Sequence, residues 1–146
     1  MSESLYPVFE VPTSGVYEPK PRKYSPAPSF DFCSGDFVTD GTHRVAMCDG
    51  REAYRQWCRK IISTQRGSCL AYMNIGIERE EAYSQPTREA VQAAFERTIT
   101  ESLLVHPCTL RVKNFEFAWE GEKLNITFTV QAVDMAAFNI TLDVIA

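Results

Sequence analysis

The sequence lacks the long apolar run of a membrane-spanning helix. None of its hydrophobic stretches approaches the ~20 consecutive apolar residues that a bilayer span requires. The opening residues Met1-Ser2-Glu3-Ser4 also lack the basic and apolar segments of a signal peptide. We therefore expect a protein that is made and kept in the cytoplasm, without a membrane partner.

An excess of basic residues is also missing. The chain of 146 residues carries 15 Lys and Arg against 19 Asp and Glu, which gives a formal net charge of -4. Binding to a phosphate backbone needs clustered cations that replace its counterions, and no such cluster is present. The composition therefore argues against a nucleic acid partner.

Cysteines are few, odd in number and widely spaced, with no C-x-x-C pair. This pattern indicates neither a disulfide framework nor a zinc ribbon. His43 with Cys48, or His106 with Cys108, falls short of a full ligand set, so we predict no metal site. The chain also has no phosphate-binding glycine motif, and we expect no cofactor. We interpret the cysteines as reduced thiols used as small apolar residues: Cys33, Cys48, Cys58, Cys69 and Cys108.

Catalytic constellations are weak. Glu78, Glu80 and Glu81 form the one dense acidic cluster, which would have to provide the paired carboxylates of a glycosidase. Neighbouring carboxylates in a polar loop more often face water, so a small peptidoglycan hydrolase is kept as an alternative. Nucleophilic catalysis by a cysteine with His43 or His106 has no local signature. We predict a protein that is not an enzyme.

Proline is scarce except at the start of the chain. Residues 1–29 hold six of the eight prolines, with aromatic side chains between them that follow no helix or strand period. At ~3.1 Å per residue, an extended arm of this kind reaches on the order of 90 Å. We expect the arm to contact a distant partner through its aromatic residues: Tyr6, Phe9, Tyr17 and Tyr24.

Residues 30–146 have the composition of a single α+β domain. Asp40-Gly41 separates two short apolar stretches and predicts a tight hairpin. Asp49, with Glu52 three residues later, resembles a capping box that starts a helix. That helix is amphipathic, with Arg51, Arg55, Gln56, Arg59 and Lys60 on its polar face and Ala53, Tyr54, Trp57, Cys58, Ile61 and Ile62 on its apolar face.

A second helix is predicted from Pro86-Thr87 to the stop at His106-Pro107. Between the helices, Gly67 closes the first one or its trailing turn, and the segment after Gly76 reads as an irregular charged loop. The remainder predicts an antiparallel meander that the two helices cover on one face. In a regular strand, every second side chain points to the same face. The apolar residues change from even positions, Leu110 and Val112, to odd positions, Phe115, Phe117 and Trp119, so we predict a bulge near Lys113-Asn114.

The last strand, residues 137–145, alternates apolar and polar residues almost to the final residue. One face is suited to burial, and the strand is expected at an edge of the sheet. An edge strand presents unpaired N–H and C=O groups, to which another chain can add a strand. We predict an interaction through these residues: Phe138, Asn139, Ile140, Thr141, Leu142, Asp143, Val144 and Ile145.

The order of short motifs resembles the sheath-initiator baseplate proteins of contractile phage tails and tail-like bacteriocins, a branch of a family once labelled lysozyme-like. The resemblance spans about residues 30–146, up to the closing meander. Its motifs are Phe30-Asp31-Phe32, Gly35-Asp36-Phe37, Asp49-Gly50, Trp57, Thr64-Gln65-Arg66-Gly67, Ile75-Gly76 and His106-Pro107.

The resemblance implies a structural protein at the junction of baseplate and sheath, where the first sheath ring adds strands to it. Implied partners are the sheath subunit, baseplate wedge proteins and tail tube proteins, first in the bacterial cytoplasm and then in the assembled particle. Family members carry Glu-Pro-Arg after the long helix, where this chain has His106-Pro107-Cys108, so only Pro107 carries over as a wedge contact. A generic adaptor protein is the further alternative.

Overall fold

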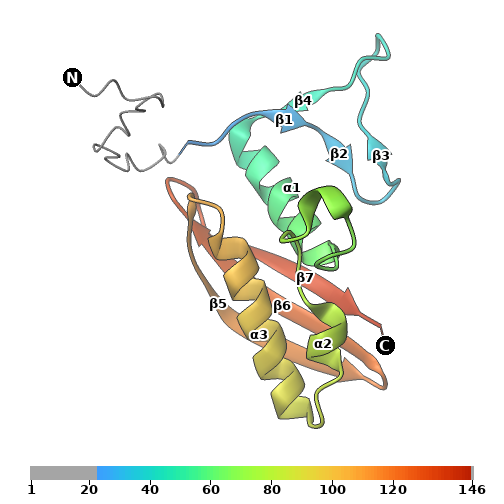
Figure 1. Ribbon diagram of the computed structural model, residues 1–146. Helices are drawn as coiled ribbons and strands as arrows, with labels where there is room; N and C mark the ends of the chain where they lie inside the picture. Colours follow the sequence, from blue (N-terminus) through green and yellow to red (C-terminus); the bar gives the residue numbers. More distant parts are fainter. Residues whose placement is uncertain (1–22, 146) are drawn as a thin grey trace, which may run out of the picture.

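The computed structural model describes residues 23–145, and its centre is one three-stranded antiparallel sheet (Figure 1). The strands β5 (Thr109–Glu120), β6 (Lys123–Ala132) and β7 (Phe138–Val144) lie in the order β5-β6-β7. Each strand pairs with the next one along the chain. The predicted meander is therefore confirmed, and β5 and β7 are its two edges.

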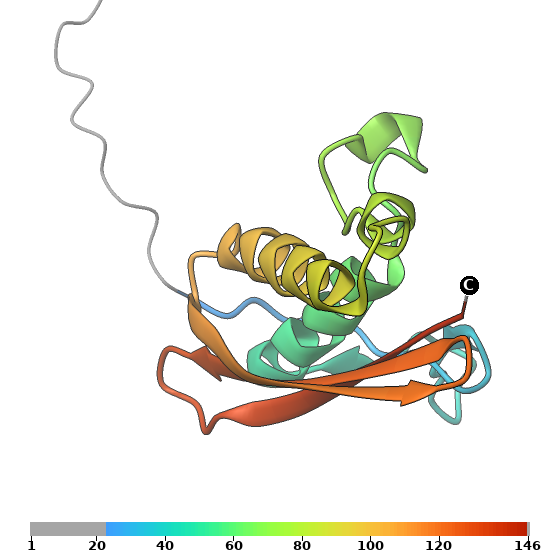
Figure 2. The same cartoon turned by 90° about the horizontal axis from the view of Figure 1, so that it is seen from below.

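Two long helices cover the same face of this sheet, as Figure 2 shows from below. They are α1 (Gly50–Ser63) and α3 (Arg88–Leu104), and the short helix α2 (Arg79–Tyr83) packs beside α3. The opposite face of the sheet carries no helix in the described part of the chain. The fold class is thus α+β, as predicted.

The core lies between the helices and the sheet. Side chains of β6 that point to the helices are fully buried, and each large apolar side chain so buried stabilises the fold by about 1.5–3 kcal/mol. The long helix α3 contributes its own buried stripe at three- and four-residue steps. Members of this core include Cys58, Ile62, Val91, Phe95, Ile99, Leu103, Leu124, Ile126, Phe128, Val130, Ile140, Leu142 and Val144.

The start of α1 confirms one half of the predicted capping box. The Asp49 carboxylate accepts a hydrogen bond from the Glu52 N–H at 2.8 Å. The Glu52 carboxylate does not return to the Asp49 N–H among the described hydrogen bonds, and instead lies 3.4 Å from Arg55 Nη1. The helix ends before Thr64, so Gly67, with φ of 78°, belongs to the trailing turn.

The predicted bulge in β5 is confirmed. The register shifts between Lys113 and Glu116, and Asn114 has a left-handed φ of 56°. A second register shift, which the parity of Leu110 and Val112 did not indicate, lies between Thr109 and Arg111 and turns Leu110 outward. Leu110 is 45% exposed while Thr109 is buried.

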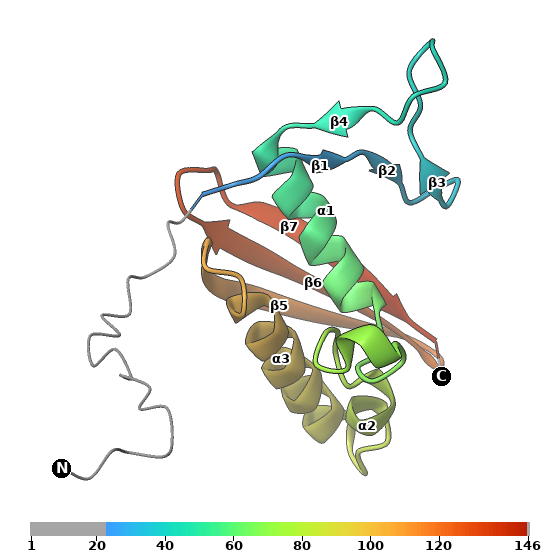
Figure 3. The same cartoon turned by 45° about the horizontal axis from the view of Figure 1, so that its top comes forward.

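Two small two-stranded sheets form the segment before α1, seen at the top of Figure 3. The strand β1 (Ala27–Pro28) pairs with β4 (Met47–Cys48), and β2 (Phe30–Asp31) pairs with β3 (Asp36–Phe37). The predicted hairpin at Asp40-Gly41 is confirmed, since the Asp40 N–H donates to the Arg44 carbonyl at 2.8 Å.

These small sheets overturn the prediction that Gln56 lies on the solvent-facing side of α1. Gln56 is 6% exposed. Its Oε1 accepts a hydrogen bond from the Phe30 N–H at 3.2 Å, and its Nε2 donates to Cys48 Sγ at 3.3 Å. Gln56 is therefore the polar link between the first helix and the small sheets that cross it.

The connection between α1 and α3 is more ordered than predicted. It contains a 3-10 turn, η1 (Leu70–Tyr72), before Gly76, and the helix α2 after Gly76, where the sequence indicated an irregular charged loop. Both elements are too short for an apolar period to show in the sequence. Across the described residues, no helix has the length and hydropathy needed to span a bilayer.

Candidate functional site

The strand β7 has the alternation that the sequence predicts. Ile140, Leu142 and Val144 are buried against the helices, while Asn139 and Thr141 are exposed on the opposite face. The strand pairs on one side with β6, from Val130 opposite Phe138 to Leu124 opposite Val144. No described strand pairs with its other side.

The ladder shows which backbone groups of β7 point to the open side. The Val133 N–H donates to the Cys108 carbonyl, toward β5, and backbone groups of alternate residues in a strand point to the same side. Odd-numbered residues of β6 therefore face β5, and even-numbered ones face β7. Their partners Phe138, Ile140, Leu142 and Val144 bond to β6, which leaves the N–H and C=O groups of Asn139, Thr141 and Asp143 pointing outward.

Side-chain hydrogen bonds on the uncovered face hold this strand in register. Thr141 Oγ1 lies 3.2 Å from Thr127 Oγ1, and Thr129 Oγ1 donates to Asn139 Oδ1 at 2.8 Å. Cross-strand pairs of this kind stabilise a sheet by roughly 0.2–1 kcal/mol each. These contacts add to the backbone ladder that holds β7 on β6.

A slot of about 280 Å³ opens beside the first half of β7. Its floor is the outer face of α1 and its walls are β2 on one side and β7 on the other. We call it the β2–β7 slot, lined by Phe30, Phe32, Glu52, Arg55, Gln56, Arg59, Phe138, Asn139 and Ile140.

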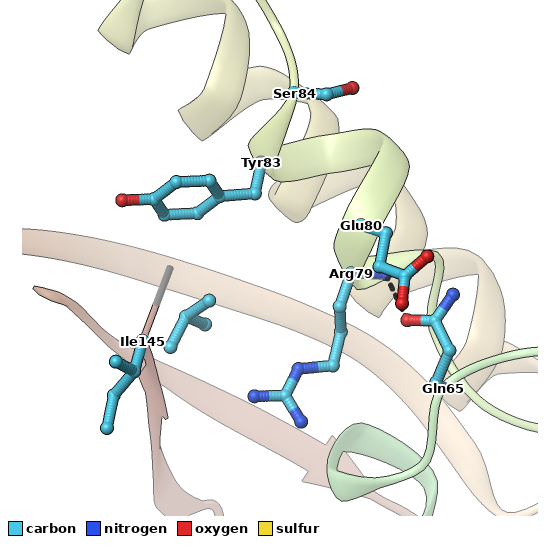
Figure 4. Close-up of a pocket in the computed structure, with 7 residues that line it drawn as sticks. Gln65, Arg79, Glu80, Tyr83, Ser84 and Ile145 are labelled. Carbon is cyan, nitrogen blue, oxygen red and sulfur yellow. Dashed lines mark hydrogen bonds between the residues drawn. The ribbon is translucent and has the colours of Figure 1, made fainter. Parts of the chain in front are cut away.

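A second hollow, of about 420 Å³, lies over the end of β7 (Figure 4). Arg79, Glu80 and Tyr83 of α2 line it together with Gln65, and Val144 and Ile145 form its apolar side. The Arg79 N–H donates to Gln65 Oε1 at 3.0 Å, which fixes the start of α2 against the end of α1.

Tyr24, a predicted partner contact, is engaged within the chain. Its ring lies 5.5 Å from that of Tyr54, and its hydroxyl donates to the Val133 carbonyl. Its backbone passes so close to Gly50 that a Cβ there would lie 2.7 Å from it. The Asp49-Gly50 motif therefore starts α1 and also gives the incoming chain room to cross. Tyr6, Phe9 and Tyr17 lie outside the described residues.

Pro107, the other predicted wedge contact, is exposed on a small apolar surface. It follows the end of α3, where Leu104 is 47% and Val105 76% exposed, and Leu110 lies just beyond it. Contiguous apolar side chains left in solvent often mark protein interaction sites. His106 of this turn also borders the hollow lined by Tyr24, so the arm enters the fold at the same end.

His106 itself is packed against aromatic rings. Its ring centroid lies 4.9 Å from that of Tyr54 and 4.8 Å from that of Trp57. Its Nδ1 accepts a hydrogen bond from the Cys108 N–H at 3.1 Å, which requires the neutral ring. Burial lowers the pKa of His106 from its ordinary value. The residue closes the turn and is held as a neutral acceptor.

The motif Thr64-Gln65-Arg66-Gly67 has a structural use. Arg66 donates from Nε to the Gly76 carbonyl at 3.2 Å, from Nη1 to Glu78 at 2.8 Å and from Nη2 to Ser102 at 3.0 Å. One guanidinium thus ties both ends of the loop to α3. We call this group of contacts the Arg66 clasp.

The clasp presents a loop that the sequence reading did not single out. Residues 67–77 contain no charged side chain, although charged residues make up 23% of the chain. Leu70 is 91% exposed, Tyr72 63% and Met73 54%. The absence of charged residues was the one sequence feature that could have drawn attention to this loop. An uncharged segment is as compatible with a buried loop as with an exposed one, so its exposure could not be predicted.

The acidic cluster is divided by the fold. Glu78 forms an ion pair with Arg66, and Glu80 lines the hollow over the end of β7. Glu81 lies instead with Glu78 in a separate, small hollow beside α3. The three carboxylates therefore do not converge on one cleft in the way that a glycosidase pair would.

The candidate cysteine and histidine side chains lie in different surroundings. Burial raises the pKa of the Cys58 thiol to about 12, so this thiol is protonated at neutral pH. His106 uses its Nδ1 on the backbone N–H of Cys108, and His43 lies in an exposed turn with φ of 61°. Within residues 23–145 no three His, Cys, Asp or Glu side chains form a group that could hold a metal ion.

Two solved structures have a fold similar to that of this chain. The chain resembles a crystal structure described as a tail lysozyme from Geobacter sulfurreducens, with 15% identity, 70% of this chain and 96% of that chain covered, and a TM-score of 0.58. It also resembles a chain in the baseplate of the anti-feeding prophage, with 18% identity, coverage of 81% and 84%, and a TM-score of 0.53. No curated protein matches the sequence.

A family model, that of the contractile injection system sheath initiator, matches residues 28–135. The match includes both long helices, β5 and β6 and ends before β7, so the part played by β7 rests on its geometry. The match covers well over half of the sequence. The chain therefore belongs to the contractile injection system sheath initiator family.

Proposed function

We propose that this protein starts the contractile sheath by β-strand addition. A strand of a sheath subunit would pair with the open side of β7, through the outward N–H and C=O groups of Asn139, Thr141 and Asp143. The supporting observation is a terminal strand whose inner side is fully paired with β6 and whose outer side faces no described strand. Strand addition of this kind is a recurring mode of protein recognition.

The protein would be held in the baseplate at the opposite side of its first helix. The arm of residues 1–29 and the apolar surface around Pro107 would contact wedge proteins, and tail tube proteins lie within reach of an extended arm. Val105 and Pro107 are exposed beside the point where the described chain enters the fold. The role is structural and uses no catalytic group. Assembly would take place in the bacterial cytoplasm and end in the finished particle.

The substitution Thr141→Pro tests strand addition. Proline removes an N–H that points to the open side, while the bonds to β6 are made by the neighbouring residues Ile140 and Leu142. We expect a folded protein that still enters baseplates but recruits at least about tenfold less sheath subunit. Electron microscopy of particles and co-purification of the sheath subunit measure this loss.

The matched control is Thr141→Val, which keeps the backbone N–H and removes the side-chain contact with Thr127. This variant should recruit sheath normally. Normal sheathed particles from the Thr141→Pro variant, with circular dichroism and melting temperature unchanged, would refute strand addition at β7. Equal loss in both variants would assign the effect to the side chain instead.

A further inference from the structure

The β2–β7 slot lies where an added strand would begin or end. Side chains of successive residues in a strand point to opposite faces, so every second side chain of a strand paired with β7 would lie on the helix-covered face. The side chain nearest Phe138 and Ile140 would enter the slot, because these residues form one of its walls. The slot therefore contacts one defined position of the incoming strand.

Two arginines of α1 reach this slot, and aromatic rings position both. Arg55 Cζ lies 5.4 Å from the ring centroid of Phe138, and Arg59 Cζ lies 5.8 Å from that of Phe32. Such cation–π contacts orient a guanidinium without neutralising its charge. The two cations thus face the same space from one turn apart on the helix.

The charge of the slot is only partly balanced. Glu52 lines it and forms an ion pair with Arg55. The remaining ion pair among residues 23–145 joins Arg66 to Glu78, so Arg59 has no carboxylate partner there. One Glu against two Arg leaves a net charge of +1 in the slot.

We infer that the β2–β7 slot recognises an acidic side chain of the added strand. An Asp or Glu of another chain, at the inward-facing position beside Phe138 and Ile140, would bind the Arg59 guanidinium through charge-assisted hydrogen bonds. The backbone ladder supplies pairing with any strand, and this contact selects one strand and its register. The inference rests on the proposed strand addition and states the chemistry of the strand that is chosen.

Two synthetic peptides test the inference. Both match the seven-residue length of β7 and read the same in either direction: acetyl-Glu-Thr-Val-Thr-Val-Thr-Glu-amide and its counterpart with Lys at both ends. A palindrome brings its terminal charge to the slot in a parallel or an antiparallel pairing. At low salt we expect the acidic peptide to bind the full-length protein about tenfold more tightly in fluorescence anisotropy.

Variants of the protein locate the effect. Arg59→Glu should remove the preference for the acidic peptide, and Arg59→Lys should keep most of it, because the positive charge remains. Arg44→Glu, an equal charge change at an exposed position in the hairpin turn, should leave the preference intact. Arg59 is exposed on α1 and loses at most its contact with Phe32, so these changes should lower the melting temperature by no more than a few degrees.

Equal binding of the two peptides, or no binding of either, overturns the inference. An equal loss of preference in Arg59→Glu and Arg44→Glu also overturns it, since the effect would then come from net charge. Dimer formation that Arg59→Glu abolishes would assign the slot to a second copy of the chain. Thr141→Pro separates the two proposals, because strand addition stands when this variant loses both peptides even if Arg59→Glu changes nothing.

Discussion

Gly76 is a single residue on which the loop between α1 and α3 depends. Its φ of 106° suits glycine, and an added Cβ would lie 2.4 Å from the Thr64 carbonyl oxygen. Its own carbonyl accepts hydrogen bonds from Arg66 and Ser102 of the Arg66 clasp. The Ile75-Gly76 motif therefore reflects a close approach of two backbones, which a sequence pattern alone does not show.

We predict that Gly76→Ala lowers the free energy of unfolding by about 3 kcal/mol or more, measured by urea denaturation. The obstructing atoms belong to the backbone, so no side chain can move aside to relieve the contact. Gly121→Ala is the matched control: its φ of 65° is also left-handed, but no atom lies within 4 Å of the added Cβ. This control should cost about 1–2 kcal/mol. Equal losses would contradict the steric argument.

His106 makes the stability depend on pH. The folded state holds the neutral ring because burial lowers the pKa of His106 below the 6.5 of the unfolded chain. The unfolded chain therefore binds more protons as the pH falls through this range, and the stability that is present above about pH 6.5 is lost below it. We predict a lower urea midpoint at about pH 5.5 than at about pH 7.5.

The variant His106→Gln should flatten this dependence, because it removes the titrating group. Asp31 and Asp40 also have a lowered pKa, caused by hydrogen bonds in exposed turns. Their contribution is lost only as the pH falls toward and below their ordinary value of 3.8, outside the range of His106. A midpoint in the His106→Gln variant that falls as steeply as in the parent would contradict the assignment.

At the scale of elements, the regular parts of the fold follow from local signals. The first helix starts at Asp49 and the second at Thr87, whose side chains accept N–H groups three residues later. The sheet follows from alternation, and the change of parity before Phe115 located the bulge. These features depend on residues that are close together in the sequence, so they can be predicted from a single amino-acid sequence.

Features that arise from contacts between distant segments were missed. Gln56 reads as a solvent-facing residue of α1, but the small sheets cross it and bury it. Leu110 shares the parity of the partly buried Val112, but a register shift turns it outward. The helix α2 spans only five residues, too few for a period to appear. Each error concerns tertiary packing that overrides a local pattern.

The candidate site also has one part that the sequence predicts and one part that it does not. The alternation of residues 137–145 predicted the strand and its buried face, and the structure shows it at the sheet edge. The β2–β7 slot was beyond prediction, because it joins three segments that lie far apart along the chain. Arg55 and Arg59 look like ordinary solvated residues until the neighbouring elements are placed. Strand addition is thus a sequence-level hypothesis, and its selectivity is a structural one.

At the scale of the whole molecule, the two proposed interaction surfaces lie on different sides of α1. The described chain enters beside Tyr54 and His106, near the exposed residues Val105 and Pro107. The open side of β7 lies along the sheet edge that α1 overlies (Figure 3). A protein that joins baseplate to sheath needs two such surfaces, so that holding one partner does not block the other.

Removal of residues 1–22 tests this separation. The described contacts of the arm begin with Tyr24, which bonds to Val133 and packs on Tyr54, so we predict a melting temperature within about 2 °C of the parent. Incorporation into baseplates should fall, because the aromatic residues before Tyr24 are lost. Quantitative immunoblotting of purified baseplates measures the incorporation. A full-length variant with serine in place of Tyr6, Phe9 and Tyr17 keeps the length of the arm and removes its aromatic side chains. It should show the same loss of incorporation.

The two surfaces should then fail in different ways. Truncation of the arm should reduce the number of baseplates that contain the protein, while those that contain it still recruit sheath through β7. Thr141→Pro should leave incorporation unchanged and reduce recruitment of sheath. Because the two defects act on successive steps, the ratio of sheath subunit to this protein in purified particles separates them. A truncated protein that enters baseplates normally would rule out the arm as an anchor and leave the apolar surface around Pro107 as the remaining candidate.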